Sequence, residues 1–378
     1  MEEVDIDAEK MVLHSQIAIE DQLASFAEMT ERPRIIFATN MAESSVTLPS
    51  VQVVIDLGME KEMAFDDRLL VHKLQRKWIS KASAKQRAGR TGRVCPGTVF
   101  RLYPESFYEI MAEFATSEVQ RTPLEYLLLQ AKQLEIGTPT TVLLRTIDAP
   151  DLYKVEEALA RLFTTGAIST MEEDFELTPF GRLCSHLPLD LSLTKFIYFG
   201  LLFQVPLEAV VLSVAISSQD ILTMPSTATS KSLRDYVDHV RVNFKTRTKF
   251  DRNQLSEPMM YLEVFKSFMA SGKSPEFCFR RSVHLKRAKL FSYSVADVAN
   301  SVHAYCKEQG LVKANRGVFD PLAMLYTKQV SFDPAAFRAS PAILKLLLAI
   351  TFDDNWLKCS FKENKDFKKI STTSVSHR

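Results

Sequence analysis

Short apolar runs in the first hundred residues predict β-strands joined by a helix. The runs MVLHS, RIIFAT and VQVVIDLG are rich in aliphatic and β-branched residues, and the last is apolar enough to be buried on both faces of a sheet. Between the first two, IEDQLASFAEM places Ile19, Leu23 and Phe26 on one side of a helix. The order strand, helix, strand predicts a β-α-β unit.

The segments that follow predict a hairpin and then a short helix. KEMAFDD and RLLVHKLQRKWIS have the character of two strands that pair with each other. After them, SAKQRAGRTG predicts a short helix, and Gly92 is available to end it because glycine readily adopts the left-handed conformation found at helix ends.

From about residue 109 the apolar periodicity becomes mostly helical. Within DLYKVEEALARLFTTGAI an apolar stripe recurs at helical spacing, and Gly166 supplies the stop; the stripe consists of Val155, Ala158, Leu159 and Leu162. The segment FELTPFGRL then offers a strand, Thr178 as N-cap and Pro179 in the first helical turn. Helix, short hairpin and helix together indicate a winged helix.

Further helices are predicted downstream, but the last residues are expected to be disordered. The helical segments expected there are 192–203, 207–217, 259–269, 275–290 and 295–307. The terminal STTSVSHR has the composition of a disordered end.

Composition and charge narrow the class of protein. With 378 residues, 46% hydrophobic and 25% charged, the chain is globular and long enough for two or three packed units. The formal net charge is only +1, so a surface for nucleic acid would have to arise from uneven charge distribution. Nine acids lie between Glu2 and Glu31, whereas nine Lys or Arg and no acid lie between Lys73 and Arg101. Two more basic clusters occupy 241–252 and 280–289.

Cysteine usage and the N-terminus point to the compartment. The five cysteines are odd in number and never form a CxxC pair, which argues against a disulfide framework and a zinc site, so we expect no metal in this chain. The opening MEEVDIDAEK is acidic where a targeting peptide would be basic, and no apolar run is long enough to span a bilayer. We therefore expect a soluble protein in the cytoplasm or nucleus, with no membrane partner.

The stretch QRAGRTGR concentrates positive charge on a bare backbone. Arg87, Arg90 and Arg93 recur every three residues with no acid among them, and like charges at this helical spacing repel unless an anion is brought to them. Arginine offers a planar fork that fits phosphate oxygens, and the glycines let a partner approach closely. The alternative is an arginine-rich face in contact with solvent only.

A second polar segment lies between the predicted strands RIIFAT and VQVVIDLG. Its threonine, asparagine, glutamate and serines follow a strand, and loops at the carboxyl ends of strands in open α/β sheets are where ligands bind. The GKS of FMASGKSPE, in contrast, is not expected to be a phosphate-binding loop. It lacks the first glycine of that motif, since residue 267 is serine, and it follows a predicted helix where such a loop follows a strand.

Taken together, these motifs resemble those of the DEAH/RHA group of superfamily 2 helicases. ATNMAESSVT resembles the family's motif V, ATNIAETSLT, and QRAGRTGR resembles its motif VI, QRAGRAGR. MVLHS, PGTVFRLY, QRTPLE, LTPFGRL and HLPLDL extend the resemblance over residues 11–212, and the helical remainder resembles the family less closely.

The resemblance implies a fold and a division into domains. The fold class is an α/β RecA-like partial domain, of the P-loop NTPase type, followed by a mostly α-helical winged-helix and helical-bundle region. The implied domains are a partial second RecA-like domain at 1–108, a winged helix at 109–182, a ratchet-like helical domain at 183–358 and a tail at 359–378 that would begin an OB-fold.

The resemblance also implies roles for individual residues. Three residues would face the γ-phosphate: Gln86, Arg90 and Arg93. The two arginines among them would act as arginine fingers. Those on the nucleotide side would be Phe26, stacked on the adenine, Ser45, which would sense the nucleotide, and Gly89. Those that would contact RNA are Thr39, Asn40, Lys73, Arg76, Lys77 and Arg87. Three alternatives remain open: Phe26 as a core residue of its helix, the hairpin lysines as a solvated charge run, and Arg87 paired with a neighbouring acid.

The implied function is that of a helicase portion rather than a complete enzyme. No Walker A, Walker B or SAT-type motif occurs here, and in the family the first RecA-like domain supplies the magnesium ligands. We therefore expect the C-terminal portion of an ATP-dependent RNA helicase, inactive alone, whose cofactor is ATP with Mg. Expected partners are mainly single-stranded RNA, held through its backbone, a first RecA-like domain in cis or in trans, and an activating protein cofactor. The alternative is a non-catalytic RNA-binding or adaptor fragment on the same scaffold.

Overall fold

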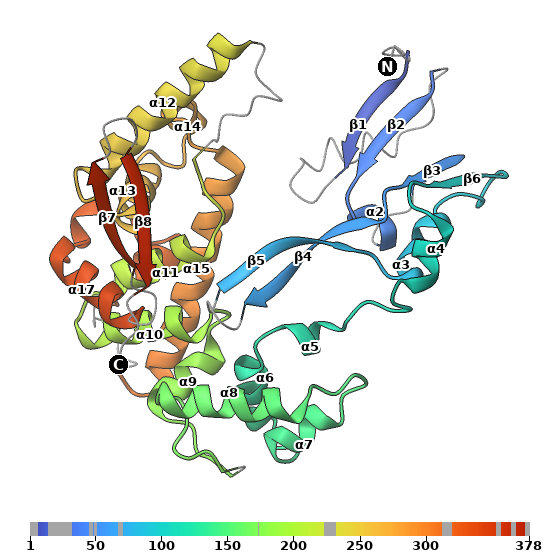
Figure 1. Ribbon diagram of the computed structural model, residues 1–378. Helices are drawn as coiled ribbons and strands as arrows, with labels where there is room; N and C mark the ends of the chain where they lie inside the picture. Colours follow the sequence, from blue (N-terminus) through green and yellow to red (C-terminus); the bar gives the residue numbers. More distant parts are fainter. Residues whose placement is uncertain are drawn as a thin grey trace. The chain divides into compact units, whose positions relative to one another are not determined.

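The computed structural model describes most of the chain and divides it into two compact units. The described residues are 7–13, 32–44, 48, 51–66, 71–172, 174–222, 232–311, 320–352, 357–363 and 368–374. Unit 1 spans Met1–Pro123 and unit 2 spans Leu124–Arg378 (Figure 1). The expected division into three domains and a tail stays a prediction.

Unit 1 consists of paired strands and short helices. The strands are β1 (Glu9–Leu13), β2 (Arg34–Ala38), β3 (Val53–Asp56), β4 (Met59–Asp66), β5 (Val71–Trp78) and β6 (Thr98–Arg101). The helices are α2 (Met41–Ser44), α3 (Lys81–Ala88), α4 (Glu105–Ile110) and α5 (Glu118–Arg121). β1 pairs with β2 and β3 with β6, both in parallel, while β4 and β5 form an antiparallel hairpin. The three predicted strands and the hairpin are confirmed; the predicted helix with Ile19, Leu23 and Phe26 lies outside the described residues.

The burial expected for the third strand is wrong. In β3, Val53 and Ile55 are 52% and 64% exposed, and only Asp56 is buried. The reason is that β3 pairs only with β6 among the described strands, so its apolar side chains are not covered as in a wide sheet.

Helix α3 begins as its sequence predicts and ends earlier. Ser80 is the N-cap, and its side chain accepts a hydrogen bond from the Ser83 N–H. The helix stops at Ala88 with Gly89 as C-cap at an ordinary φ of −69°, so Gly92, at φ +76°, does not end it. Ile79, Ala84 and Tyr103 form a small core that holds the helix in place.

Unit 2 is almost entirely helical. Its helices are α6 (Glu125–Leu134), α7 (Pro139–Leu144), α8 (Leu152–Thr164), α9 (Pro179–His186), α10 (Leu191–Leu202), α11 (Pro206–Ser217), α12 (Leu233–Asp251), α13 (Glu257–Ala270), α14 (Pro275–Arg280), α15 (Leu285–Glu308), α16 (Ala323–Tyr326), the 3₁₀ helix η1 (Pro334–Ala336) and α17 (Pro341–Thr351). A hairpin follows, of β7 (Leu357–Glu363) and β8 (Lys368–Ser374).

Several local predictions in unit 2 are confirmed. The stripe residues Val155, Ala158, Leu159 and Leu162 of α8 are buried, and Gly166 has φ +78° just beyond the helix. Thr178 caps α9 by accepting a hydrogen bond from the Gly181 N–H. Between these helices, Ile168 and Leu177 form a single antiparallel bridge where a short hairpin is predicted. The winged-helix arrangement itself stays a prediction.

Other boundaries differ from the prediction. The helices expected at 275–290 and 295–307 are instead α14 and the 24-residue α15, with the break near Ser282, which has a φ of +51°. The helix continues through FSYS because Phe291 and Ser292 are buried, and packing outweighs weak local propensity. Residues 371–374 of the expected disordered end belong to β8.

The core of unit 2 centres on α11, which is buried over most of its length. Gly200 on α10 lets this helix approach α11 closely, and Phe265 of α13 and Phe291 of α15 meet edge to face at 5.4 Å. Among the helices of the described ranges, none combines the length and apolar character needed to cross a membrane.

Replacing Gly200 by alanine is expected to destabilise unit 2. A Cβ atom at this position would lie 2.2 Å from the Cβ of Ala209 on α11. Because two packed helices cannot accept an extra methyl group there without moving apart, the free energy of unfolding should fall by about 1–3 kcal/mol, as measured by urea denaturation.

Gly89→Ala is the matched control for this substitution. Gly89 also lies at a helix end, but it has an ordinary φ and the nearest atom to an added Cβ is 3.4 Å away. If Gly200→Ala cost no more stability than Gly89→Ala, the close approach of Gly200 to Ala209 would not limit the packing of α10 on α11.

Candidate functional site

The residues predicted to face a phosphate lie at the end of α3 and in the turn beyond it. Gln86 is on the last turn of the helix and is exposed. Arg90 follows the helix and is partly buried, and Arg93 lies in the loop, exposed, with its Nε donating to the Gly89 carbonyl at 3.2 Å. Thr91 fixes this loop, because its hydroxyl donates to the Val51 carbonyl at 2.6 Å. Four of the predicted residues, Gly89 included, therefore belong to one short segment.

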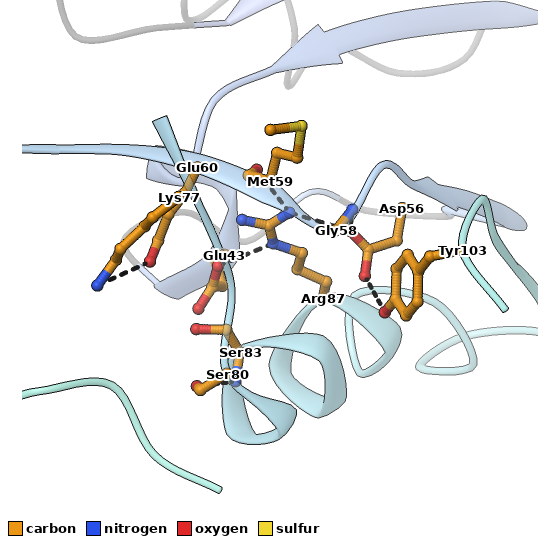
Figure 2. Close-up of polar contacts among 10 residues, drawn as sticks. All are labelled: Glu43, Asp56, Gly58, Met59, Glu60, Lys77, Ser80, Ser83, Arg87 and Tyr103. Atoms are coloured by element: carbon orange, nitrogen blue, oxygen red, sulfur yellow. Dashed lines mark hydrogen bonds and ion pairs between the residues drawn. The ribbon is translucent and has the colours of Figure 1, made fainter. Parts of the chain in front are cut away.

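Arg87, in the last turn of α3, binds acids of unit 1 (Figure 2). Its Nε donates to Glu43 Oε2 and its Nη1 to Asp56 Oδ1, both at 3.0 Å. Nη1 also donates to the Met59 carbonyl at 3.2 Å. Arg87 therefore pairs with neighbouring acids, which is one of the two possibilities that the sequence left open. A contact of Arg87 with RNA stays a prediction.

Asp56, at the end of β3, receives hydrogen bonds from three segments of the chain. Its side chain is 1% exposed. Oδ1 accepts from Arg87 and from the Gly58 N–H at 2.9 Å, and Oδ2 accepts from the Tyr103 hydroxyl at 3.0 Å. Gly58 has φ +72°, and a Cβ there would lie 2.7 Å from the Tyr103 ring, so this turn requires glycine. The carboxylate thus ties α3 and the residues after β6 to β3.

The electrostatics of this network favour the ionised pair and a neutral tyrosine. Although burial acts to lower it, the hydrogen bonds and charges of Glu43 and Asp56 raise the pKa of Arg87 above its ordinary value. Burial, and then the hydrogen bond and charge of Asp56, raise the pKa of Tyr103 to about 12. Truncation of Arg87 would leave buried carboxylate charge unbalanced, which is the costly way to break such a pair.

The polar segment after β2 supplies the second half of the site. Thr39 and Asn40 are exposed, and their carbonyls accept from the N–H groups of Ala42 and Glu43 at the start of α2. Glu43 is the residue that reaches Arg87, so this segment and α3 are directly joined. Phe26 and Ser45, predicted on the nucleotide side, lie outside the described residues.

The β4–β5 hairpin has two chemically different faces. One carries exposed side chains only: Met59, Lys61, Met63, Leu74, Arg76 and Trp78. On the other, Lys77 Nζ lies 3.6 Å from Glu60 and 2.6 Å from Glu62, and Glu62 also pairs with Arg121 at 3.5 Å. Arg76 and Lys77 therefore point to opposite sides. Lys73 is in β5, in register with Ala64 of β4.

Residues that the motif pattern missed are Glu43, Asp56, Gly58 and Tyr103. A signal for one of them was present, since Asp56 is a single acid that ends an apolar strand. GKS follows helix α13 and not a strand, as the sequence predicts. Two histidines make local contacts: His284 caps α15, and His186 Nε2 lies 3.0 Å from Glu308.

Tyr103 is expected to titrate late and to lose its high pKa in part when Asp56 is changed. Stabilisation from the neutral phenol is present below about pH 10, the pKa of a free tyrosine, and is lost as pH rises toward the folded value. The absorbance titration of the wild type minus that of Tyr103→Phe should give a midpoint near pH 12. In Asp56→Asn the midpoint should move down but stay above that of free tyrosine, because burial persists. An ordinary midpoint in the wild type would contradict the hydrogen bond to Asp56.

Comparison with known proteins identifies the same region. Residues 3–95 match the family described as helicase conserved C-terminal domain. The chain is 32% identical over 306 residues to probable ATP-dependent RNA helicase DHX34 of Mus musculus, covering 79% of this chain and 25% of that protein. It is 38% identical over 246 residues to DExH-box ATP-dependent RNA helicase DExH3 of Arabidopsis thaliana, covering 62% and 20%. Probable ATP-dependent RNA helicase spindle-E of Aedes aegypti is 34% identical over 232 residues, covering 59% and 17%.

The family match at residues 3–95 includes both motifs around Arg87. The matched family has a RecA-like fold, which confirms the α/β part of the predicted fold class. The chain spans a quarter or less of the length of the three relatives. It belongs to the superfamily 2 helicases of the DExH/DEAH group, of which it contains a C-terminal region.

Proposed function

We propose that this chain is the C-terminal portion of an ATP-dependent RNA helicase and presents Arg90 and Arg93 to ATP held by a first RecA-like domain. The observation that carries the proposal is the anchor formed by Arg87 with Glu43 and Asp56. It fixes the end of α3, from which the other two arginines follow. The relatives named ATP-dependent RNA helicases support the activity.

The chemistry of the segment fits a polyphosphate. The sequence contains no acid between residues 73 and 101, and Arg93 is exposed. ATP, with Mg held by the first domain, would place against this segment a γ-phosphoryl group whose negative charge is spread over its oxygens during transfer. Arginines placed against that charge can increase the rate by roughly 10³ to 10⁵. Gln86 would face the γ-phosphate beside them. Gly89 would allow close approach, Phe26 would stack on the adenine and Ser45 would sense the nucleotide.

RNA binding is proposed for the exposed face of the hairpin and the segment after β2. Lys61 and Arg76 offer charge for phosphates, while Trp78, 48% exposed, offers an aromatic ring on which a base can stack. Thr39 and Asn40 would hold the RNA backbone. Lys73 and Lys77 remain proposed contacts, but Lys77 would first have to exchange its two glutamates for phosphate.

The remaining proposals concern architecture and cell biology. The bridge between Ile168 and Leu177, with α8 before it and α9 after it, supports a winged helix within 109–182. The helices beyond 183 would form the ratchet-like domain. Free cysteines among the described residues and the relatives' named activity support an intracellular location, in cytoplasm or nucleus, and an activating protein cofactor remains part of the proposal.

Substitution of either finger should abolish hydrolysis without releasing RNA. With the first RecA-like domain present, Arg90→Ala and Arg93→Ala should each lower the ATPase kcat by roughly 10³ or more, and RNA affinity should stay within a few fold. Arg90→Lys should be nearly as inactive, because lysine lacks the planar fork. Steady-state ATPase and fluorescence anisotropy measure the two quantities.

Arg145→Ala is a suitable control, since Arg145 is exposed and belongs to unit 2. Retained activity in Arg90→Lys would remove the finger role from this residue. If the unsubstituted chain, with the first RecA-like domain present, bound RNA but hydrolysed no ATP, the adaptor function would be the better account.

The two hairpin faces should differ in the salt dependence of RNA binding. Neutralising Lys61 and Arg76 together should lower the slope of log K against log salt by about 1.4, at ~0.7 per phosphate contact on a single strand. Lys77→Gln should change the slope little, because its charge is already balanced by Glu60 and Glu62. Titrations with single-stranded RNA at several salt concentrations would test this. If Lys77→Gln changed the slope as much as neutralising Lys61 and Arg76, the hairpin charges would be better described as a solvated charge run.

A further inference from the structure

Helix α12 exposes an apolar stripe that the fold of unit 2 does not use. Leu233, Val237, Val240 and Phe244 are 76%, 42%, 40% and 70% exposed. Their spacing of four, three and four residues places them in one line along about three turns of the helix. Single exposed apolar residues are ordinary, whereas contiguous exposed apolar patches are typical of interaction sites.

The helix is held by a different side. Its buried residues are Asn243, Thr246 and Phe250, with the Phe250 ring 6.5 Å from that of Phe277. Arg247 pairs with Asp220 and, at 3.1 Å, with Glu257. The N-terminal end of α12 extends past the other helices of unit 2 (Figure 1). The buried residues therefore lie in the C-terminal half of α12 and on a different side of the helix from the stripe.

The edge of the stripe away from the protein body is basic. Each stripe residue is followed by a residue about 100° further round the helix, and these are Arg234, Asp238, Arg241 and Lys245. All four are exposed, and the one acid among them is paired with Arg241 at 3.1 Å. An apolar line flanked by positive charge results.

We propose that this stripe binds an acidic amphipathic helix of a partner protein. Leucine-type residues of such a helix would cover the four apolar side chains, and its glutamates would face Arg234, Arg241 and Lys245. A second copy of this chain fits poorly. If the stripes of two copies packed antiparallel, the basic edge of one helix would lie against the basic edge of the other, and like charges would repel. RNA also fits poorly, since three of the four stripe residues are aliphatic and cannot stack on bases.

The probe is a fluorescent peptide of about 21 residues with leucine at the two core positions of each heptad and glutamate at the flanking ones. Anisotropy with the full chain should show saturable binding. Val240→Gln should weaken it about tenfold or more, since a buried aliphatic contact is lost. Arg234→Glu with Arg241→Glu should reverse the preference toward the same peptide with lysine flanks.

Val242→Gln is the matched control. Val242 is 47% exposed on the same helix but lies on the side opposite the stripe, so binding should not change. Circular dichroism establishes that each variant is folded. The proposal is overturned if Val240→Gln and Val242→Gln act alike, if Val240→Gln instead abolishes a dimer seen by sedimentation, or if single-stranded RNA binds in place of the peptide.

Discussion

The carboxylate of Asp56 is the point on which the arrangement of unit 1 depends. Buried charge is tolerated only where hydrogen bonds and an opposite charge compensate for lost water. Here the compensation comes from Arg87, Tyr103 and the Gly58 backbone, groups separated by long stretches of sequence. None of the three can move without leaving the charge exposed to a low-dielectric surrounding. The cost of that charge is what makes the segment after α3 a defined surface and not a loose loop.

Local patterns predicted the elements well where the elements are decided locally. The stripe of α8, the cap at Thr178 and the β4–β5 hairpin follow from periodicity, capping and strand composition. Burial of β3 and the length of α15 did not, because they depend on which neighbours cover Val53, Ile55 and Phe291. The sequence did not predict helix α12, because its pattern of apolar residues is weak. Only the C-terminal half of this helix has buried residues.

The candidate site shows the same division. Three arginines without an acid nearby in sequence led to the prediction of an anion site, which stays a prediction. The sequence could not show that Arg87 meets Glu43 and Asp56, which lie 44 and 31 positions away, because pairing at that distance is a property of the fold. Arg87 and Arg93 look equivalent in the sequence, but in the structure Arg87 pairs with two acids and Arg93 is exposed.

The hairpin carries a constraint on how this chain can vary in length. Since strand side chains alternate, the sign of its outward face depends on whether a residue stands at an odd or even position. Insertion of one residue within β4 would bring glutamates out in place of Lys61 and turn a cationic surface anionic. Insertions where the two strands connect would leave that parity intact. Variation in related chains should therefore concentrate between the strands, with the strands themselves changing by substitution alone.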